Sequence, residues 1–304
     1  MIKKVGRLGI LAALVAVLVF ALGGIALFYT EVGMASEIGE GVQETYLPEC
    51  EYAAIPPSVV EDATALAREL VGDGHDRFQD LVNQLLASYM EARDRDIVVV
   101  FNSGGWGWNL LAETPGWASI IEGIKAELDG LDYKSLVLNY HRTGGGLRAC
   151  VREFFEVFNH APSKAKELAG RIEFLTEHIP NLRVIVAGES TGTVISDGAM
   201  NILRDNTRVY SIQTGTPFWH KPVALDRTLL MNSNGKTLDT FSYGKVTAMV
   251  WASVKGWFGF LSPEENPGTV LSWLRAPGHD YSWQYTGVCS AVAEFLEENF
   301  GSSS

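Results

Sequence analysis

The sequence has few cysteines, a shortage of positive charge and only one long apolar run. Its three cysteines, Cys50, Cys150 and Cys289, are too few for a disulfide scaffold and allow at most one intramolecular bridge. The 24 Lys and Arg residues are outnumbered by 36 Asp and Glu, which gives a formal charge of −12. An acidic body repels phosphate backbones, so nucleic acid is not expected as a partner. Apolar residues make up 47% of the 304 residues, which excludes a disordered chain.

Signatures of metal and cofactor binding are also missing. His, Asp and Glu do not occur at ligand spacings such as H-E-x-x-H, and the glycine-rich segments lack the Walker and dinucleotide-binding patterns. The sequence therefore predicts neither a metal site nor a cofactor.

The long apolar run, Leu8 to Tyr29, contains 22 residues without a charge. As a helix it would extend about 33 Å, which is enough to cross a bilayer. Basic residues precede the run and Glu31 follows it, so the positive-inside rule places the N-terminus in the cytoplasm and the rest of the chain outside. The alternative is a cleaved signal peptide with its cleavage site after Gly33-Met34-Ala35, which would give a secreted protein. We favour the uncleaved anchor because the run is longer than an ordinary signal sequence.

The rest of the chain divides into three parts. After the cytoplasmic tip and anchor, residues 1–29, residues 30–57 lack periodicity and indicate a stalk or linker. Residues 58–95 show two apolar stripes at helical spacing and predict two helices that pack on the following domain. That domain comprises residues 96–300.

Residues 96–300 alternate short β-branched runs with helical patterns, which is typical of a mostly parallel sheet covered by helices on both faces. The sequence thus predicts an α/β fold. The expected strands are residues 97–101, 135–140, 183–187, 209–214 and 228–231. The expected helices are residues 117–128, 165–179, the segment after residue 190, and 288–296.

The most informative segment is the third strand with the turn and helix that follow it. The strand runs directly into Gly188-Glu-Ser-Thr-Gly192, a G-x-S-x-G motif in a strand–turn–helix context. A serine at the apex of so tight a turn has a strained backbone, and the flanking glycines leave room for the neighbouring strand and helix. The Ser190 hydroxyl then projects at a helix N-terminus, where the amide of Thr191 can donate to an oxyanion. The alternative is an ordinary turn with Ser190 as the helix cap.

With this motif the chain resembles the α/β-hydrolase superfamily of lipase- and esterase-like enzymes over residues 96–300. The resemblance implies that Ser190 is a nucleophile and that the acid and the histidine follow it in that order. Only His220 and His279 follow Ser190. His279 lies just before the last predicted helix, which is the family position for the general base, whereas His220 is expected to be structural or to line the pocket.

The acid partner of the histidine is less clear from the sequence. Asp239 follows a predicted strand and the Asn234-Gly235 turn, and is the first candidate. Asp226 is the second candidate, and Asp280, adjacent to His279, is expected to point away.

The resemblance also implies a second oxyanion donor in the loop after the first predicted strand. The family's usual His-Gly pair is absent there, and Asn102-Ser-Gly-Gly105 takes its place. The expected donor is the amide of Gly104 or of Gly105, because glycine allows close backbone approach.

A strongly apolar segment, residues 246–261, lies between the candidate acid and His279. A helix that is apolar on nearly all sides is either buried or faces lipid. We expect a core helix beneath the sheet. The alternative is a lid or membrane-dipping element that admits apolar substrates.

Together these features predict a membrane-anchored, extracytoplasmic serine hydrolase that cleaves carboxylic esters, with a small ester or lipid-like substrate, through Ser190, His279 and Asp239. The alternatives are a non-catalytic binding module on the same fold, and an acyltransferase or thioesterase with the same triad.

Overall fold

The computed structural model describes residues 54–74, 77–105, 107, 111–141, 155–157, 159–260, 268–271 and 274–301. The predicted anchor over residues 1–29, the signal-cleavage alternative, nearly all of the stalk, and Cys50 and Cys150 lie outside these residues. In the part of the chain that is described, no helix is both long and apolar enough to span a bilayer. Cys289, which falls within that part, carries a free thiol.

The centre of the fold is a five-stranded sheet in which every neighbouring pair of strands is parallel. The strand order is β2-β1-β3-β4-β5. The strands are β1 (Ile97–Asn102), β2 (Ser135–Asn139), β3 (Arg183–Glu189), β4 (Val209–Thr214) and β5 (Thr228–Met231). The predicted α/β class is confirmed, and each expected strand forms within two residues of its predicted bounds. The runs in β1 and β3 are continuous and largely β-branched because both faces of the sheet are covered there.

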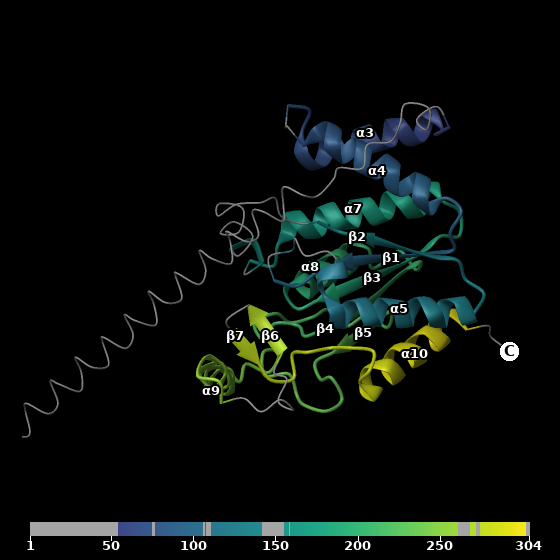
Figure 1. Ribbon diagram of the computed structural model, residues 1–304. Coiled ribbons are helices and arrows are strands. Elements are labelled where there is room, and N and C mark those ends of the chain that lie inside the picture. The colour runs from purple at the N-terminus through teal and green to yellow at the C-terminus, as the bar shows by residue number, and fades with distance from the viewer. Residues whose placement is uncertain are drawn as a thin grey trace, which may run out of the picture.

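Successive residues of β1 point to opposite faces of the sheet and contribute to two separate cores. Val98 and Val100 belong to a core that also includes the buried faces of α4 (Phe78–Ala92), α7 (Pro162–His178) and α8 (Thr191–Ile202). Ile97, Val99 and Phe101 belong to a second core formed with α5 (Pro115–Gly130) and α10 (Thr286–Phe300). A short 3-10 turn, η1 (Leu111–Glu113), precedes α5. The result is three layers, with helices above and below the sheet (Figure 1).

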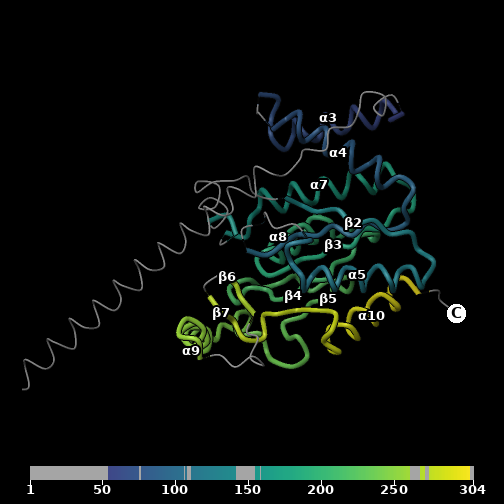
Figure 2. Tube along the Cα trace, viewed as in Figure 1, coloured from purple at the N-terminus to yellow at the C-terminus, as the bar shows by residue number. Residues whose placement is uncertain are grey.

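The first described helix, α3 (Pro57–Val71), packs outside the layer of α4 and α7 (Figures 1 and 2). Its apolar stripe includes Val59 and Ala63, which are buried in the core shared with α7. Gly170 of α7 makes this contact close, because a Cβ at that position would lie 3.0 Å from Cδ1 of Leu66. The two helices predicted over residues 58–95 therefore share a core with the helix that covers one face of the sheet.

The apolar segment 246–261 departs from the expected core helix. It forms α9 (Val246–Trp257), which packs on a two-stranded antiparallel hairpin, β6 (Gly268–Leu271) and β7 (Leu274–Ala276), beyond one end of the sheet (Figure 1). Only Met249, Ala252 and Ser253 of α9 are buried, whereas Trp251 is 63% exposed. The expectation of a helix beneath the sheet was wrong, because α10 and α5 already fill that face.

Candidate active site

The functional side chains gather where the carboxyl ends of β1 and β3 lie side by side. The chain passes from β1 to β2 on one side, then crosses back to β3 on the other, so the strand order reverses between β1 and β3. Ligands of open α/β sheets bind outside the carboxyl ends of strands at such a reversal. The loop beginning at Ser103 follows β1, and Ser190 follows β3, so both lie at this point.

The loop after β1 and the start of α8 approach each other closely at two glycines. A Cβ at Gly192 would lie 2.3 Å from the carbonyl oxygen of Asn102, which is too close for any side chain at that position. A Cβ at Gly104 would lie 3.0 Å from Cβ of Ser190. The second glycine of G-x-S-x-G thus lets the start of α8 pack against the end of β1.

Ser190 has a backbone conformation that is costly for any residue other than glycine. Its φ is 48° and its ψ is −119°, directly between β3 and α8. The Ser190 amide donates to the carbonyl of Thr214 on β4, and the Ser190 carbonyl accepts from the amide and hydroxyl of Thr193. These bonds hold the strained turn. The Ser190 side chain makes no capping bond to the helix. The hydroxyl is therefore free to act outside the helix.

The structure brings together the three side chains singled out from the sequence. Oγ of Ser190 lies 3.0 Å from Nε2 of His279. Nδ1 of His279 lies 2.7 Å from Oδ2 of Asp239. His279 is 9% exposed to solvent, whereas Asp239 is fully buried. The arrangement gives the serine a proton acceptor and gives the imidazole a fixed orientation, as general-base activation of a nucleophile requires.

Four donors besides the imidazole hold the Asp239 carboxylate. Oδ1 accepts from the amides of Phe241 and Ser242, and Oδ2 accepts from the hydroxyls of Ser242 and Tyr281. Burial alone would raise the pKa of Asp239, but the bond and charge of His279, together with the Tyr281 and Ser242 bonds, outweigh it and lower the pKa. Burial and the Asp239 charge raise the pKa of the Tyr281 hydroxyl, so it remains a donor. The carboxylate stays ionised while fully buried.

We expect Tyr281→Phe to reduce the free energy of unfolding by about 1.5–3 kcal/mol near neutral pH, since it removes a hydrogen bond to a charged group. The lowered pKa of Asp239 stabilises the native state above the ordinary aspartate pKa of about 3.9, and this stabilisation is lost as the pH falls through the lower native value. Without Tyr281 that pKa rises, so the difference between native and variant should shrink below pH of about 4. Denaturant unfolding at several pH values measures it.

Tyr285→Phe is the matched control, because the Tyr285 hydroxyl binds Asp280 and not Asp239. Its effect on unfolding should not be accompanied by a change in the rate at which Ser190 is acylated, whereas Tyr281→Phe should lower that rate as well. A Tyr281→Phe variant with the native acid dependence and native rate would contradict this role of Tyr281.

The three candidate oxyanion donors lie at one place, but not all are equally available. Thr191 is the first residue of α8, so its amide has no acceptor within the helix, and its hydroxyl donates to the carbonyl of Gly105 at 2.7 Å. Gly105 has a φ of 56°. The Gly104 amide already donates to Oε2 of Glu189 at 3.0 Å. The Gly104 amide is therefore already bonded, whereas the Thr191 amide lies at the open N-terminus of α8.

The alternative acids do not reach the imidazole. Asp226 is exposed just before β5, next to Arg227, which donates to carbonyls at the amino end of β4. It therefore lies at the edge of the sheet opposite to Ser190. Asp280 binds Nδ2 of Asn234 at 3.0 Å and the Tyr285 hydroxyl, and so points away from His279 as expected.

His220 belongs to a different set of contacts from the base. Its Nε2 lies 2.9 Å from Oδ2 of the buried Asp197 on α8, and its Nδ1 lies 3.1 Å from Nδ1 of His160. The other Asp197 oxygen accepts from the amide of Val223. Asp197 thus ties the loop after β4 to α8, which is the structural role expected for His220.

Tyr281 and Ser242 were not found from the sequence. Tyr281 stands two residues after His279, and Ser242 three residues after Asp239, but no motif marks a hydroxyl as the partner of a distant carboxylate. An Asp-x-x-Ser turn is a weak local signal for Ser242, because such residues bond to the backbone and side chains a few positions away.

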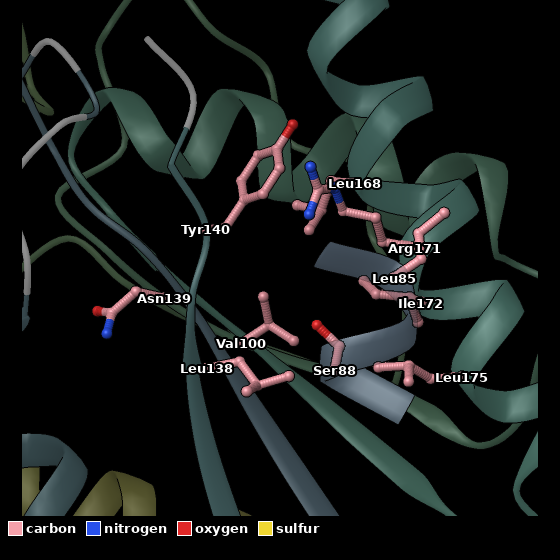
Figure 3. Close-up of a pocket in the computed structure, with 10 residues that line it drawn as sticks. All are labelled: Leu85, Ser88, Val100, Leu138, Asn139, Tyr140, Leu168, Arg171, Ile172 and Leu175. Carbon is pink, nitrogen blue, oxygen red and sulfur yellow. The ribbon is translucent and has the colours of Figure 1, made fainter. Parts of the chain in front are cut away.

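A small cavity elsewhere in the fold is distinct from this site. It lies between β1, β2, α4 and α7, and its lining is mostly apolar (Figure 3). Arg171, the charged side chain in its lining, is paired with Glu167 at 3.0 Å. None of Ser190, His279 and Asp239 lines it, so we assign no chemistry to the cavity. Among the residues that the structure describes, no group of three or more His, Cys, Asp or Glu is placed to hold a metal ion.

No protein-family model matches the chain, and no match is found among curated proteins. Among solved structures, the chain is similar to Trichoderma reesei cutinase in complex with a C11Y4 phosphonate inhibitor. The identity is 16% and the TM-score 0.44, over 82% of this chain and 95% of the cutinase chain. It is also similar to an acetylxylan esterase at 13% identity and a TM-score of 0.38, over 67% of this chain and 98% of the esterase. Both TM-scores are below 0.5, so neither likeness indicates a function, which has to be argued from the geometry of the site.

Proposed function

We propose that this chain is a serine hydrolase of the α/β-hydrolase type that cleaves carboxylic esters through an acyl-enzyme. The observation that carries the proposal is the hydrogen-bonded series Ser190–His279–Asp239, which begins at a strained turn between a strand and a helix. A binding module would not need a serine held in a costly backbone conformation against an imidazole that a buried carboxylate orients.

In the proposed reaction, Oγ of Ser190 attacks the ester carbonyl carbon while Nε2 of His279 accepts the hydroxyl proton. The imidazolium is stabilised by Asp239, which accepts from Nδ1 and remains ionised. The tetrahedral intermediate expels the alcohol, to which His279 returns the proton. Water then attacks the acyl-enzyme with His279 again as the base, which releases the acid and restores Ser190.

The negative charge that develops on the carbonyl oxygen requires preorganised donors. We assign the Thr191 amide as one donor and the Gly105 amide as the second. The Thr191 hydroxyl supports this pairing, because its bond to the Gly105 carbonyl fixes the two residues relative to each other. The positive end of α8 adds to the stabilisation at the same position.

Aromatic side chains beside the imidazole favour an ester with an apolar acyl group. The ring of Phe241 lies edge-on to His279, with 5.0 Å between centroids. Trp219 and Phe218 pack against Phe241, and Phe218 is 50% exposed. A row of aromatic rings therefore runs from the half-exposed Phe218 through the buried Phe241 to the imidazole, and an acyl chain that packs against the exposed end would bury apolar area.

A series of p-nitrophenyl esters from acetate to octanoate tests the proposal. We expect hydrolysis of all members, with kcat/KM rising with chain length by up to about a few-fold per methylene, as the apolar contact grows. The corresponding p-nitroanilides are the control and should react much more slowly. Faster cleavage of the anilides would indicate a peptidase or amidase, and no reaction with any ester would contradict the proposal.

We further propose that residues 8–29 anchor the chain in a membrane with residues 30–304 on the extracytoplasmic side. The support is the charge-free run of 22 residues and the basic residues that precede it. Protease added to intact cells or spheroplasts should digest the body of the protein. Full protection from protease would contradict this orientation.

A further inference from the structure

The solvent-facing side of α9 is apolar, the reverse of an ordinary surface helix. Val250 and Trp251 are followed, at steps of three or four residues, by Val254 and Phe258, and these four share the face opposite the buried Met249, Ala252 and Ser253. Trp257 and Phe260 continue the exposed surface at the C-terminal end. We call Val246, Val250, Trp251, Trp257, Phe258 and Phe260 the α9 face. Each is 45–73% exposed, and soluble monomers seldom display so many large apolar side chains together.

The charge of this region is opposite to that of the whole chain. Residues 240–260 contain Lys245 and Lys255 but no Asp or Glu, in a chain of formal charge −12. Arg275 of β7 also lies here, since a Cβ at Gly256 would lie 2.2 Å from its Nε. Glu264 and Glu265, which follow in the sequence, lie outside the described residues. Tryptophan and phenylalanine flanked by basic side chains suit the interface of an anionic bilayer.

The buried side of α9 connects this surface to the candidate active site. Met249 packs with Phe241 and Ala276 in a small core of its own. Phe241 in turn contacts the His279 ring. The buried side of α9 is thus linked to the imidazole through Met249 and Phe241.

We infer that the α9 face binds the surface of an anionic lipid bilayer, which brings the exposed Phe218 and the aromatic rings behind it toward the membrane. Aromatic and aliphatic side chains enter the interface, and the exposed Lys245 meets the lipid phosphates. The anchor proposed for residues 8–29 would keep the same chain near a membrane, where this occupant is available. The lipid contact itself requires no catalysis. The further step, in which the contact delivers lipid-borne esters to Ser190, rests on the proposed function.

The test uses the full chain with the fluorescent amino acid dansylalanine in place of Val250, reconstituted in vesicles of phosphatidylcholine and phosphatidylglycerol. Vesicle-bound protein is isolated by flotation. We expect a blue shift in emission and quenching by lipids with brominated acyl chains. The matched control carries dansylalanine in place of Glu91, an exposed residue of α4, which lies well away from α9 (Figure 1). The control should show neither effect, and vesicles of phosphatidylcholine alone should give a weaker signal at position 250.

Equal, water-like emission from positions 250 and 91 in anionic vesicles would overturn the inference. A blue-shifted probe at position 250 before lipid is added would also overturn it, and would assign the α9 face to another part of this chain. Burial that grows with protein concentration in the absence of vesicles would overturn it in favour of a second copy.

A catalytic measurement separates this inference from the proposed function. Trp251→Ser with Phe258→Ser should leave hydrolysis of a soluble short-chain ester unchanged and lower hydrolysis of a vesicle-borne ester by about tenfold or more. Probe burial without hydrolysis of any ester would refute the enzyme while the lipid contact stands. Ester hydrolysis without probe burial would refute the lipid contact alone.

Discussion

Replacing Ser190 with alanine is expected to lower kcat for ester hydrolysis by about 10⁴- to 10⁶-fold, the largest effect of any single change in this chain. The variant loses the attacking oxygen, and the remaining groups can only position water and stabilise the oxyanion. The fold should persist, because the Ser190 hydroxyl makes one bond, to His279, while the backbone bonds of the turn remain. Steady-state kinetics with a p-nitrophenyl ester measures the loss.

Ser163→Ala provides the control for this change. Ser163 is exposed and its hydroxyl donates to Glu156, so native activity is expected. The thermal unfolding midpoint of both variants should lie close to the native value. If Ser190→Ala retained more than a small fraction of native activity while folded, another nucleophile would have to be sought.

Asp239→Asn should have the second largest effect, a loss of about 10⁴-fold in kcat. An amide NH₂ facing Nδ1 of His279 favours the imidazole tautomer in which Nδ1 accepts, and Nε2 then carries the proton. That nitrogen can no longer take a proton from Ser190. The substitution is nearly isosteric, and the bonds from the Phe241 and Ser242 amides can be kept, so the loss should be in rate more than in stability.

Asp280→Asn makes the sharpest comparison, since Asp280 is adjacent to His279 in the sequence. Its carboxylate binds Asn234 and Tyr285 and makes no contact with the imidazole. We expect activity within a few-fold of native. A larger loss in Asp280→Asn than in Asp239→Asn would exchange the two assignments and contradict the role given to Asp239.

The sheet was predictable because its strands are buried on both faces. Ile97 to Phe101 and Arg183 to Ala187 are continuous β-branched runs, and such runs have few alternatives to a central parallel strand. The turn at Ser190 was predictable for a related reason. Gly188 is needed where β3 meets α8, and Gly192 where α8 meets the end of β1, so the packing leaves a mark in the sequence.

The environment of α9 could not be predicted in the same way. The sequence of an apolar helix does not show whether another element covers it. Residues 246–261 were therefore expected beneath the sheet. The β6–β7 hairpin on which α9 packs has strands of four and three residues, too short for a clear alternating pattern.

The polar partners of the site depend on contacts between distant residues. His279 could be selected by its position in the chain, but the Tyr281 bond to Asp239 joins residues 42 positions apart. The bond from the Gly104 amide to Glu189 spans 85 positions. No local pattern specifies such pairs, because they are set by how the loops of different strands meet.

The most direct measurement is covalent labelling with a fluorophosphonate, followed by mass spectrometry of the digested protein. An activated serine displaces fluoride and becomes phosphonylated, whereas an ordinary surface serine does not react. The site predicts a single adduct on the peptide containing Ser190, absent in Ser190→Ala and strongly slowed in Asp239→Asn. A folded native chain that remains unlabelled, or that carries the adduct on a different serine, would contradict the proposed catalytic site.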